Sequence, residues 1–110
     1  MSDPRIKTIK IKTGVVKRLT KDKVMYEKEA EQQEAKIEKL KSKGEDEFNI
    51  RKQEEVLQET LMMVPSSQRR LQKAFEELSN IVESEKDLAE DPEYLAAVEV
   101  LEGAKPHIPA

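Results

Sequence analysis

The sequence contains no cysteine and no tryptophan, and aromatic residues make up only 4% of its 110 residues. Without cysteine, disulfide bonds and thiolate-bound metals are excluded, and a reducing compartment is weakly favoured. So few aromatic residues would fill a spherical core poorly, which favours an elongated molecule with a thin apolar seam. No apolar run approaches the ~18 residues of a membrane span, and the N-terminus lacks the apolar segment of a signal peptide. We therefore expect a cytoplasmic protein that does not enter a membrane.

Charge is abundant, and its distribution is uneven. Charged residues make up 39% of the chain, and the net charge is -3. From Arg5 to Lys23 there are eight basic residues against one acid, whereas from Glu76 to Glu102 there are ten acids against one base. Nucleic acid is not an expected partner, because most of the chain is acidic and no nucleic-acid-binding motif is present.

Helix start and stop signals divide the chain into three helices of a single domain. The expected helices cover about residues 4–43, 49–88 and 92–104, and they are followed by a flexible tail over residues 105–110. A capping residue precedes each helix: Ser2 or Asp3, then Asn49 or Asp46, then Asp91. Gly44 suits the left-handed position that ends the first helix.

Apolar residues recur every three or four positions in both long helices, which indicates a narrow buried stripe. In the first helix the stripe follows Ile9, Lys12, Val16, Leu19, Lys23, Tyr26, Ala30, Gln33, Ile37 and Leu40. In the second helix it follows Ile50, Glu54, Leu57, Leu61, Val64, Gln68, Leu71, Phe75, Leu78 and Val82. The pattern predicts an all-α, coiled-coil-like fold, an elongated antiparallel three-helix bundle with a short third helix.

A proline lies in the middle of the second stripe. Pro65 removes one helical hydrogen bond and clashes with the carbonyl of Leu61. The three–four spacing nevertheless continues through it, so we expect the second helix to be kinked or interrupted at Pro65. Ser66 or Ser67 could cap the second half if the helix restarts there.

The short turn near Asp46 makes the first two helices antiparallel neighbours and places Pro65 level with Glu27. It also confines the third helix to one end of the rod, ending near Val16. Where helix 1 has two neighbours it should be broadly apolar, at Ile6, Ile9, Ile11, Val15, Val16 and Leu19.

The same alignment sets the basic block of helix 1 beside the acidic block of the other two helices. One reading is that the charges pair within the bundle and set its register. The other is that part of the basic block faces outward and steers an acidic partner. The candidate partner-binding cations are Lys17, Arg18, Lys21, Arg69 and Arg70.

Four large apolar residues near the proline fall outside both stripes. They are Val24, Met25, Met62 and Met63. If the third helix stops short of them, they form, together with Pro65, an adaptable surface for a partner, because methionine side chains are flexible. The alternative is that the C-terminal tail folds back over them or that the helices rotate to bury them.

Residues that carry catalysis are missing. The only histidine, His107, lies in a proline-flanked tail, and the acids are spread along exposed helix faces. No nucleophile has a base nearby, and no metal-binding cluster is present. We expect no enzyme activity and no cofactor.

Three runs of sequence carry a resemblance to a known family. They are IKIKTGVVKRL from Ile9 to Leu19, KVMYEKEAEQQEAKIEKL from Lys23 to Leu40, and MMVPSSQRRL from Met62 to Leu71. Together they resemble the tubulin-specific chaperone A family, also called tubulin-binding cofactor A. The chain departs from the family's pattern around the proline, where Val64, Ser66 and Ser67 replace Ile, Asp and Cys.

The resemblance implies a three-helix bundle and a cytosolic, cytoskeleton-associated chaperone without catalytic residues. It implies that the protein captures β-tubulin folding intermediates and passes them on, with other tubulin cofactors, during αβ-tubulin assembly. The alternative function is an antiparallel coiled-coil scaffold or adaptor that bridges other proteins. We expect a monomer or a weak homodimer.

Overall fold

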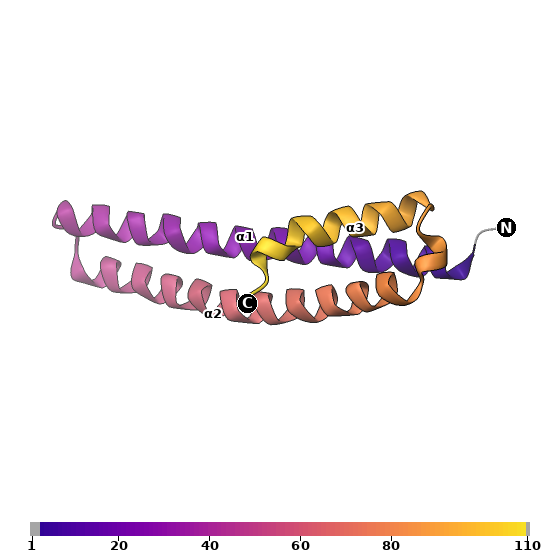
Figure 1. Cartoon of the computed structure of the whole chain (residues 1–110). Helices are drawn as coiled ribbons and strands as arrows, with labels where there is room; N and C mark the ends of the chain where they lie inside the picture. The colour runs from indigo at the N-terminus through magenta and orange to yellow at the C-terminus, as the bar shows by residue number, and fades with distance from the viewer. Residues whose placement is uncertain (1–2, 110) are drawn as a thin grey trace.

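The computed structural model describes residues 3–109 and shows a rod of three helices, with extents of 65 × 28 × 17 Å. Its elements are α1 (Pro4–Ser42), α2 (Glu47–Ser84), a 3-10 turn η1 (Lys86–Leu88), α3 (Pro92–Ala104) and a 3-10 turn η2 (Lys105–His107). In Figure 1, α1 and α2 run side by side along the whole rod, and α3 covers one end only. The predicted antiparallel three-helix bundle is confirmed.

The predicted turn after α1 is built around Gly44. This glycine has a φ of 69°, in the left-handed region that other residues rarely adopt. The N–H groups of Gly44 and Glu45 donate to the carbonyls of Lys41 and Leu40, at 3.1 Å each. This pair of hydrogen bonds satisfies helix-end carbonyls in the Schellman arrangement.

α2 begins at Glu47, earlier than the start that a cap at Asn49 predicted. The N-cap is Asp46 rather than Asn49, since the Asp46 carboxylate accepts from the N–H of Phe48 at 3.4 Å. The Asp46 carbonyl also accepts from the N–H of Ile50 at 3.0 Å, the first bond of the helical ladder. A cap at Asn49 is therefore wrong, because the helix has already begun at Glu47.

α2 also ends earlier than predicted, at Ser84 instead of Leu88. The chain tightens into η1, where the N–H of Leu88 donates to the carbonyl of Glu85 at 2.9 Å. α3 begins as predicted, with the N–H of Glu93 donating to the Asp91 carboxylate at 2.8 Å. At the start of α1, the cap is Asp3. The alternative cap, Ser2, lies outside the described residues.

The expectation of a flexible tail needs correction for residues 105–109. The chain continues from α3 into η2, where the N–H of Ile108 donates to the carbonyl of Lys105 at 3.1 Å. Ile108 is partly buried against the core, so an apolar contact holds the segment down. Ala110 lies outside the described residues.

The stripe predicted on α1 is confirmed. Its fully buried members are Ile9, Val16, Leu19, Lys23, Ala30 and Ile37, and the other four are half-buried. The prediction of a broad apolar face on α1 is wrong at Ile11, which is 57% exposed. Ile11 lies two residues after Ile9, about 200° round the helix, and so points away from the core.

The stripe predicted on α2 is only partly correct. Leu71 and Leu78 are fully buried, but Leu57 and Phe75 are half-buried. The buried line of α2 is instead Ser67, Leu71, Ala74 and Leu78. It is rotated from the predicted stripe because α2 packs on both α1 and α3 at this end of the rod.

The predicted register between α1 and α2 agrees with the contacts across them. Glu27 and Pro65 line the same hollow between the two helices. Farther toward the turn, the side-chain amide of Gln33 donates to the backbone carbonyl of Gln53 at 3.0 Å. Toward the other end, Lys12 pairs with Glu77 at 3.1 Å.

Arg5 lies where the start of α1, the end of α2 and η1 come together. Its guanidinium donates to the carboxylates of Asp3, Glu85 and Asp87, and so links the start of α1 to the end of α2 and to η1. Hydrogen bonds from Arg5 hold the pKa of Asp3 and of Asp87 below the ordinary value of 3.8. These carboxyls therefore favour the folded state in their charged form.

The first prediction compares two leucines of the predicted α2 stripe. Leu71→Ala should lower the free energy of unfolding by about 2–5 kcal/mol, since Leu71 is 0% exposed and leaves a cavity. Leu61→Ala should lower it by about 1 kcal/mol or less, because Leu61 is already 38% exposed. Urea denaturation measures both values, and equal losses would contradict the observed packing.

The second prediction concerns pH. Arg5→Gln should lower the melting temperature at neutral pH, because Asp3 and Asp87 lose their charged partner. Arg5 stabilises the fold fully at pH values above 3.8, the pKa of the two carboxyls in the unfolded chain. Its contribution is lost as the pH falls through the lower pKa values that Asp3 and Asp87 have in the folded state. The gap between variant and parent should therefore shrink below about pH 4. Thermal unfolding followed by circular dichroism at several pH values tests this, and a constant gap would contradict it.

Candidate partner-binding surfaces

The basic block of helix 1 divides between the two predicted roles. Arg5 and Lys12 pair with acids on the neighbouring elements, which supports the register role for these two. Lys17, Arg18 and Lys21 are exposed, and within residues 3–109 none of them has an acidic partner within salt-bridge distance. These three cations therefore face solvent and remain available to a partner.

The outward cations belong to a stripe that is longer than the predicted set of partner-binding cations. Exposed lysines at spacings of three, four and seven follow the outer side of α1: Lys7, Lys10, Lys17, Lys21 and Lys28. Ile11 and Gly14 lie within this stripe and are also exposed. The spacing alone could have revealed it, because residues at these intervals share one side of a helix.

The four apolar residues predicted near the proline are all exposed. Met62 is 74% exposed and Met25 is 44% exposed, and Val24 and Met63 are comparable to Met25. The tail does not cover them, because they remain exposed while its apolar residue Ile108 packs against the core cluster. The alternative that the helices rotate to bury them is also excluded.

These four residues do not form one flat patch. Met25 follows the buried Val16 by nine positions, and Met62 precedes the buried Leu71 by nine. Nine residues make two and a half turns at 3.6 residues per turn, so each methionine points away from its helix's buried side. They project from opposite edges of the rod, because α1 and α2 turn their buried sides toward each other. We call Val24, Met25, Met62 and Met63 the girdle.

The two candidate arginines of α2 are exposed, and within the described part of the chain neither has an acidic partner. Arg69 follows Met62 by seven positions, which is close to two turns, so the two residues share the outer side of α2. Arg70 lies next to it, about 100° round the helix. Met62 and Arg69 therefore combine an apolar and a cationic side chain on one edge.

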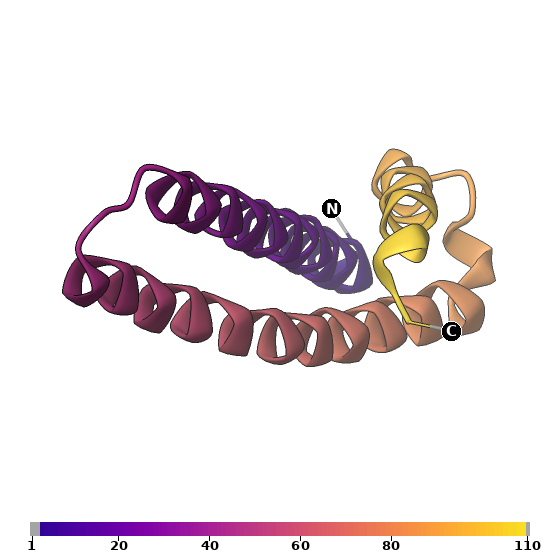
Figure 2. The same cartoon turned by 90° about the vertical axis from the view of Figure 1, so that its left-hand side faces the viewer.

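Pro65 does not interrupt α2, which runs unbroken from Glu47 to Ser84. Figure 2 shows α2 as a single bowed helix. The alternative of a helix that restarts at Ser66 or Ser67 is therefore wrong. Ser67 is instead fully buried, and its hydroxyl has no hydrogen-bond partner among the described atoms.

Within residues 3–109, no group of three or more histidine, aspartate and glutamate side chains is arranged to hold a metal ion. None of the helices described combines the length and the apolar content that crossing a membrane requires.

Comparison with known proteins shows which family this chain belongs to. A family model described as tubulin binding cofactor A matches residues 4–101. The chain belongs to the tubulin binding cofactor A family. Tubulin-specific chaperone A of Rattus norvegicus is 59% identical over 105 residues, which cover 96% of this chain and 97% of the relative.

Solved structures of family members share the fold. The human tubulin chaperone cofactor A is 55% identical, with a TM-score of 0.82, and the match covers 93% of this chain and 99% of that one. Tubulin folding cofactor A from Arabidopsis thaliana is 34% identical, with a TM-score of 0.85 and coverage of 93% and 96%. The tubulin binding cofactor A architecture therefore persists where two thirds of the residues differ.

The third prediction concerns Ser67, the buried serine of α2. Ser67→Ala should raise the free energy of unfolding by about 1 kcal/mol, because it removes a buried hydroxyl that makes no hydrogen bond. Ser66→Ala, next to it and half-exposed, should change it by a few tenths. Urea denaturation tests both, and a loss of stability in Ser67→Ala would show that the hydroxyl has a partner.

Proposed function

We propose that this protein is a tubulin folding cofactor that binds β-tubulin folding intermediates and passes them on during αβ-tubulin assembly. Membership of the tubulin binding cofactor A family makes tubulin the first partner to consider. The observation that carries the proposal is the girdle, in which four large apolar side chains, as two adjacent pairs, remain exposed near the middle of the rod. Exposed apolar side chains that gather in one region mark sites of interaction.

The chemistry of the girdle suits a partly folded client. Such a client exposes apolar surface whose shape changes as it folds, and flexible methionine side chains adapt to different shapes. Because the girdle lies on two opposite edges of the rod, a client that uses all of it must contact more than one face. An extended or incompletely folded chain can do so more readily than a rigid globular one.

The unpaired cations add an electrostatic component. Lys17 and Arg18 on α1 and Arg69 on α2 lie at the same part of the rod as the girdle, and they face solvent. Exposed positive charge raises the rate at which an acidic partner is captured and makes capture sensitive to salt. The proposed client surface therefore combines apolar contact with attraction for acid.

The proposed activity is binding without catalysis or a cofactor. His107, the only histidine, lies in η2 at the end of the chain, and the acids lie along helix surfaces. We propose further that the protein acts in the cytoplasm as a monomer or weak homodimer and hands its client to other tubulin cofactors. A scaffold that bridges two folded proteins would not need adaptable methionines.

The fourth prediction tests the girdle. Exchanging Met62 and Met63 for Gln should weaken capture of newly released β-tubulin and leave the melting temperature nearly unchanged, since both side chains are exposed. Leu95→Gln is the matched control, because Leu95 is as exposed but lies on α3. Capture is measured by native gel shift with β-tubulin released from a cytosolic chaperonin. Equal capture by the double variant and the parent would overturn the proposed role of the girdle.

A second arm of the same experiment tests the cations. Lys17→Glu with Arg18→Glu should weaken capture, and the loss should be largest at low salt. Lys36→Glu with Lys39→Glu is the control, because it makes the same charge change elsewhere on α1. Both pairs should retain the parent's melting temperature, because none of the four cations has an ion pair in the described chain. A lowered melting temperature with unchanged capture would mean that Lys17 and Arg18 serve register instead.

A further inference from the structure

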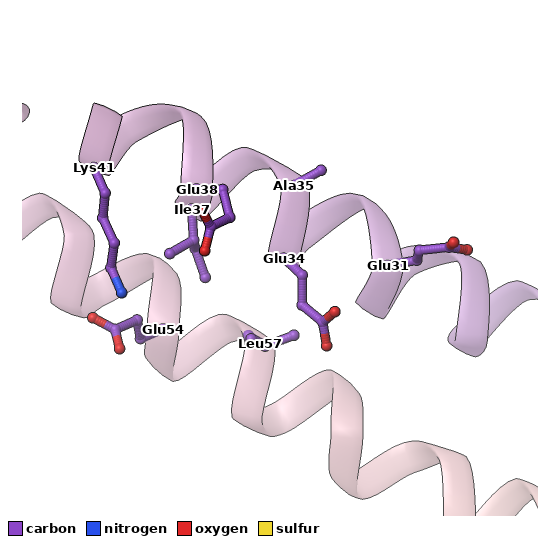
Figure 3. Close-up of a pocket in the computed structure, with 8 residues that line it drawn as sticks. All are labelled: Glu31, Glu34, Ala35, Ile37, Glu38, Lys41, Glu54 and Leu57. Atoms are coloured by element: carbon purple, nitrogen blue, oxygen red, sulfur yellow. The ribbon is translucent and has the colours of Figure 1, made fainter. Parts of the chain in front are cut away.

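The groove between α1 and α2 continues beyond the end of α3. It contains two adjoining hollows, with volumes of about 420 and 520 Å³, which share Glu31 and Glu34. The first lies beside Pro65 and the second lies nearer the α1–α2 turn. In Figure 3, Glu34 of α1 and Leu57 of α2 point into the space between the two helices. We call these two hollows together the open groove.

The open groove lies on the same face of the rod as α3. Phe75, Ser79 and Val82 of α2 line a hollow with Val98 and Leu101 of α3. Leu57, Leu61 and Val64 line the open groove, and each precedes one of those three α2 residues by 18 positions. Eighteen residues are five full turns at 3.6 residues per turn, so both sets share one side of α2. The open groove is the unoccupied continuation of the α3 seat.

The bottom of the open groove is apolar. Ala30 and Ile37 are buried there, and Leu57 and Val64 are half-buried. Leu61, which precedes Ser79 of the α3 seat by five turns, remains 38% exposed. An apolar strip of this kind is the surface that α3 covers at the other end of the rod.

The walls of the open groove are acidic. Five glutamates line it: Glu27, Glu31, Glu34, Glu38 and Glu54. Lys41 is the one cation among the described lining residues. Of the five glutamates, only Glu27 has an ion pair within the described chain, with Lys23 at 3.4 Å. At the equivalent places under α3, five turns before Glu27 and Glu34, α1 has the buried apolar residues Ile9 and Val16.

We propose that the open groove binds an amphipathic helix of a partner protein, with lysine or arginine flanking an apolar stripe. The apolar strip matches the stripe of such a helix, and the glutamates match its cations. The helix would continue α3 along the rod and complete a three-helix bundle over its second half. This surface shares only Pro65 with the residues proposed for client capture, and the inference does not depend on the partner being tubulin.

A second copy of this chain fits the open groove less well. Its basic helix is α1, but the apolar side of α1 is already buried against α2 and α3. Its outer basic side offers a single exposed large apolar residue between Lys7 and Lys21, which is Ile11. Its α3 carries acids rather than bases, so the glutamates of the groove would repel it.

The probe is a synthetic helical peptide of about 15 residues, about 22 Å long, with leucines along one side and lysines beside them. A comparison peptide keeps the leucines and replaces each lysine by glutamate. With the full chain, the lysine peptide should bind in fluorescence anisotropy and the glutamate peptide should not. Amide shifts in nuclear magnetic resonance should concentrate in residues 27–41 and 54–65. Shifts spread over the outer sides of the helices would overturn the proposal.

Two charge-matched variants locate the site. Glu31→Lys with Glu34→Lys should weaken the lysine peptide about tenfold or more, which corresponds to about 1.4 kcal/mol. Glu29→Lys with Glu55→Lys changes the net charge equally but involves residues outside the open groove, and it should alter affinity by about twofold at most. Equal losses would mean nonspecific attraction and would overturn the proposal. A dimer in sedimentation that only the first variant dissociates would assign the groove to a second copy and would also overturn it.

Discussion

The packing of α1 against α2 along a narrow apolar seam is the contact on which the rest of the structure depends. Each long helix buries only the side that meets its neighbour, because the chain has too few large apolar residues to build a wider core. A molecule held in this way is long and thin, and most of its helix surface faces water. Where α3 does not cover them, large apolar residues outside the seam are exposed, as the girdle shows.

The length of α3 divides the rod into two structurally different halves. Where α3 packs, Tyr94, Ala97 and Ala104 close the core, the Tyr94 hydroxyl donates to the Val82 carbonyl at 2.8 Å, and Arg5 ties the ends together. Where α3 is absent, the same seat is an apolar strip lined by four glutamates of α1 and by Glu54 of α2. The girdle lies near the boundary. The closed half supplies stability, and the open half leaves surface for partners.

Charge follows the same division. The outer side of α1 carries the lysine stripe, whereas the open groove is acidic, so the rod presents surfaces of both signs although its net charge is only -3. Opposite surfaces on one small protein allow it to distinguish acidic from basic partners by electrostatics. A client held at the girdle and a helix held in the groove would meet different faces.

Much of this architecture could be read from the residues. The three–four spacing identified the buried side of α1 correctly from Ile9 to Ile37, and the spacing of Met62 showed that it lies outside the seam. The same reasoning failed for α2, where Ser67 and Ala74 are buried and Leu61 is exposed. A heptad pattern assumes one neighbour, and α2 has two at one end and one at the other.

The sequence by itself determined the helices, their antiparallel order, the short third helix and the family, because capping residues, apolar spacing and residue identities are local properties of the chain. Only the tertiary structure decided three other features: which side of α2 is buried, that the girdle lies on opposite edges of the rod, and that the α3 seat continues as an acidic groove. These depend on how each helix is rotated relative to its neighbours. That rotation results from the packing of all the side chains together, and no single segment encodes it.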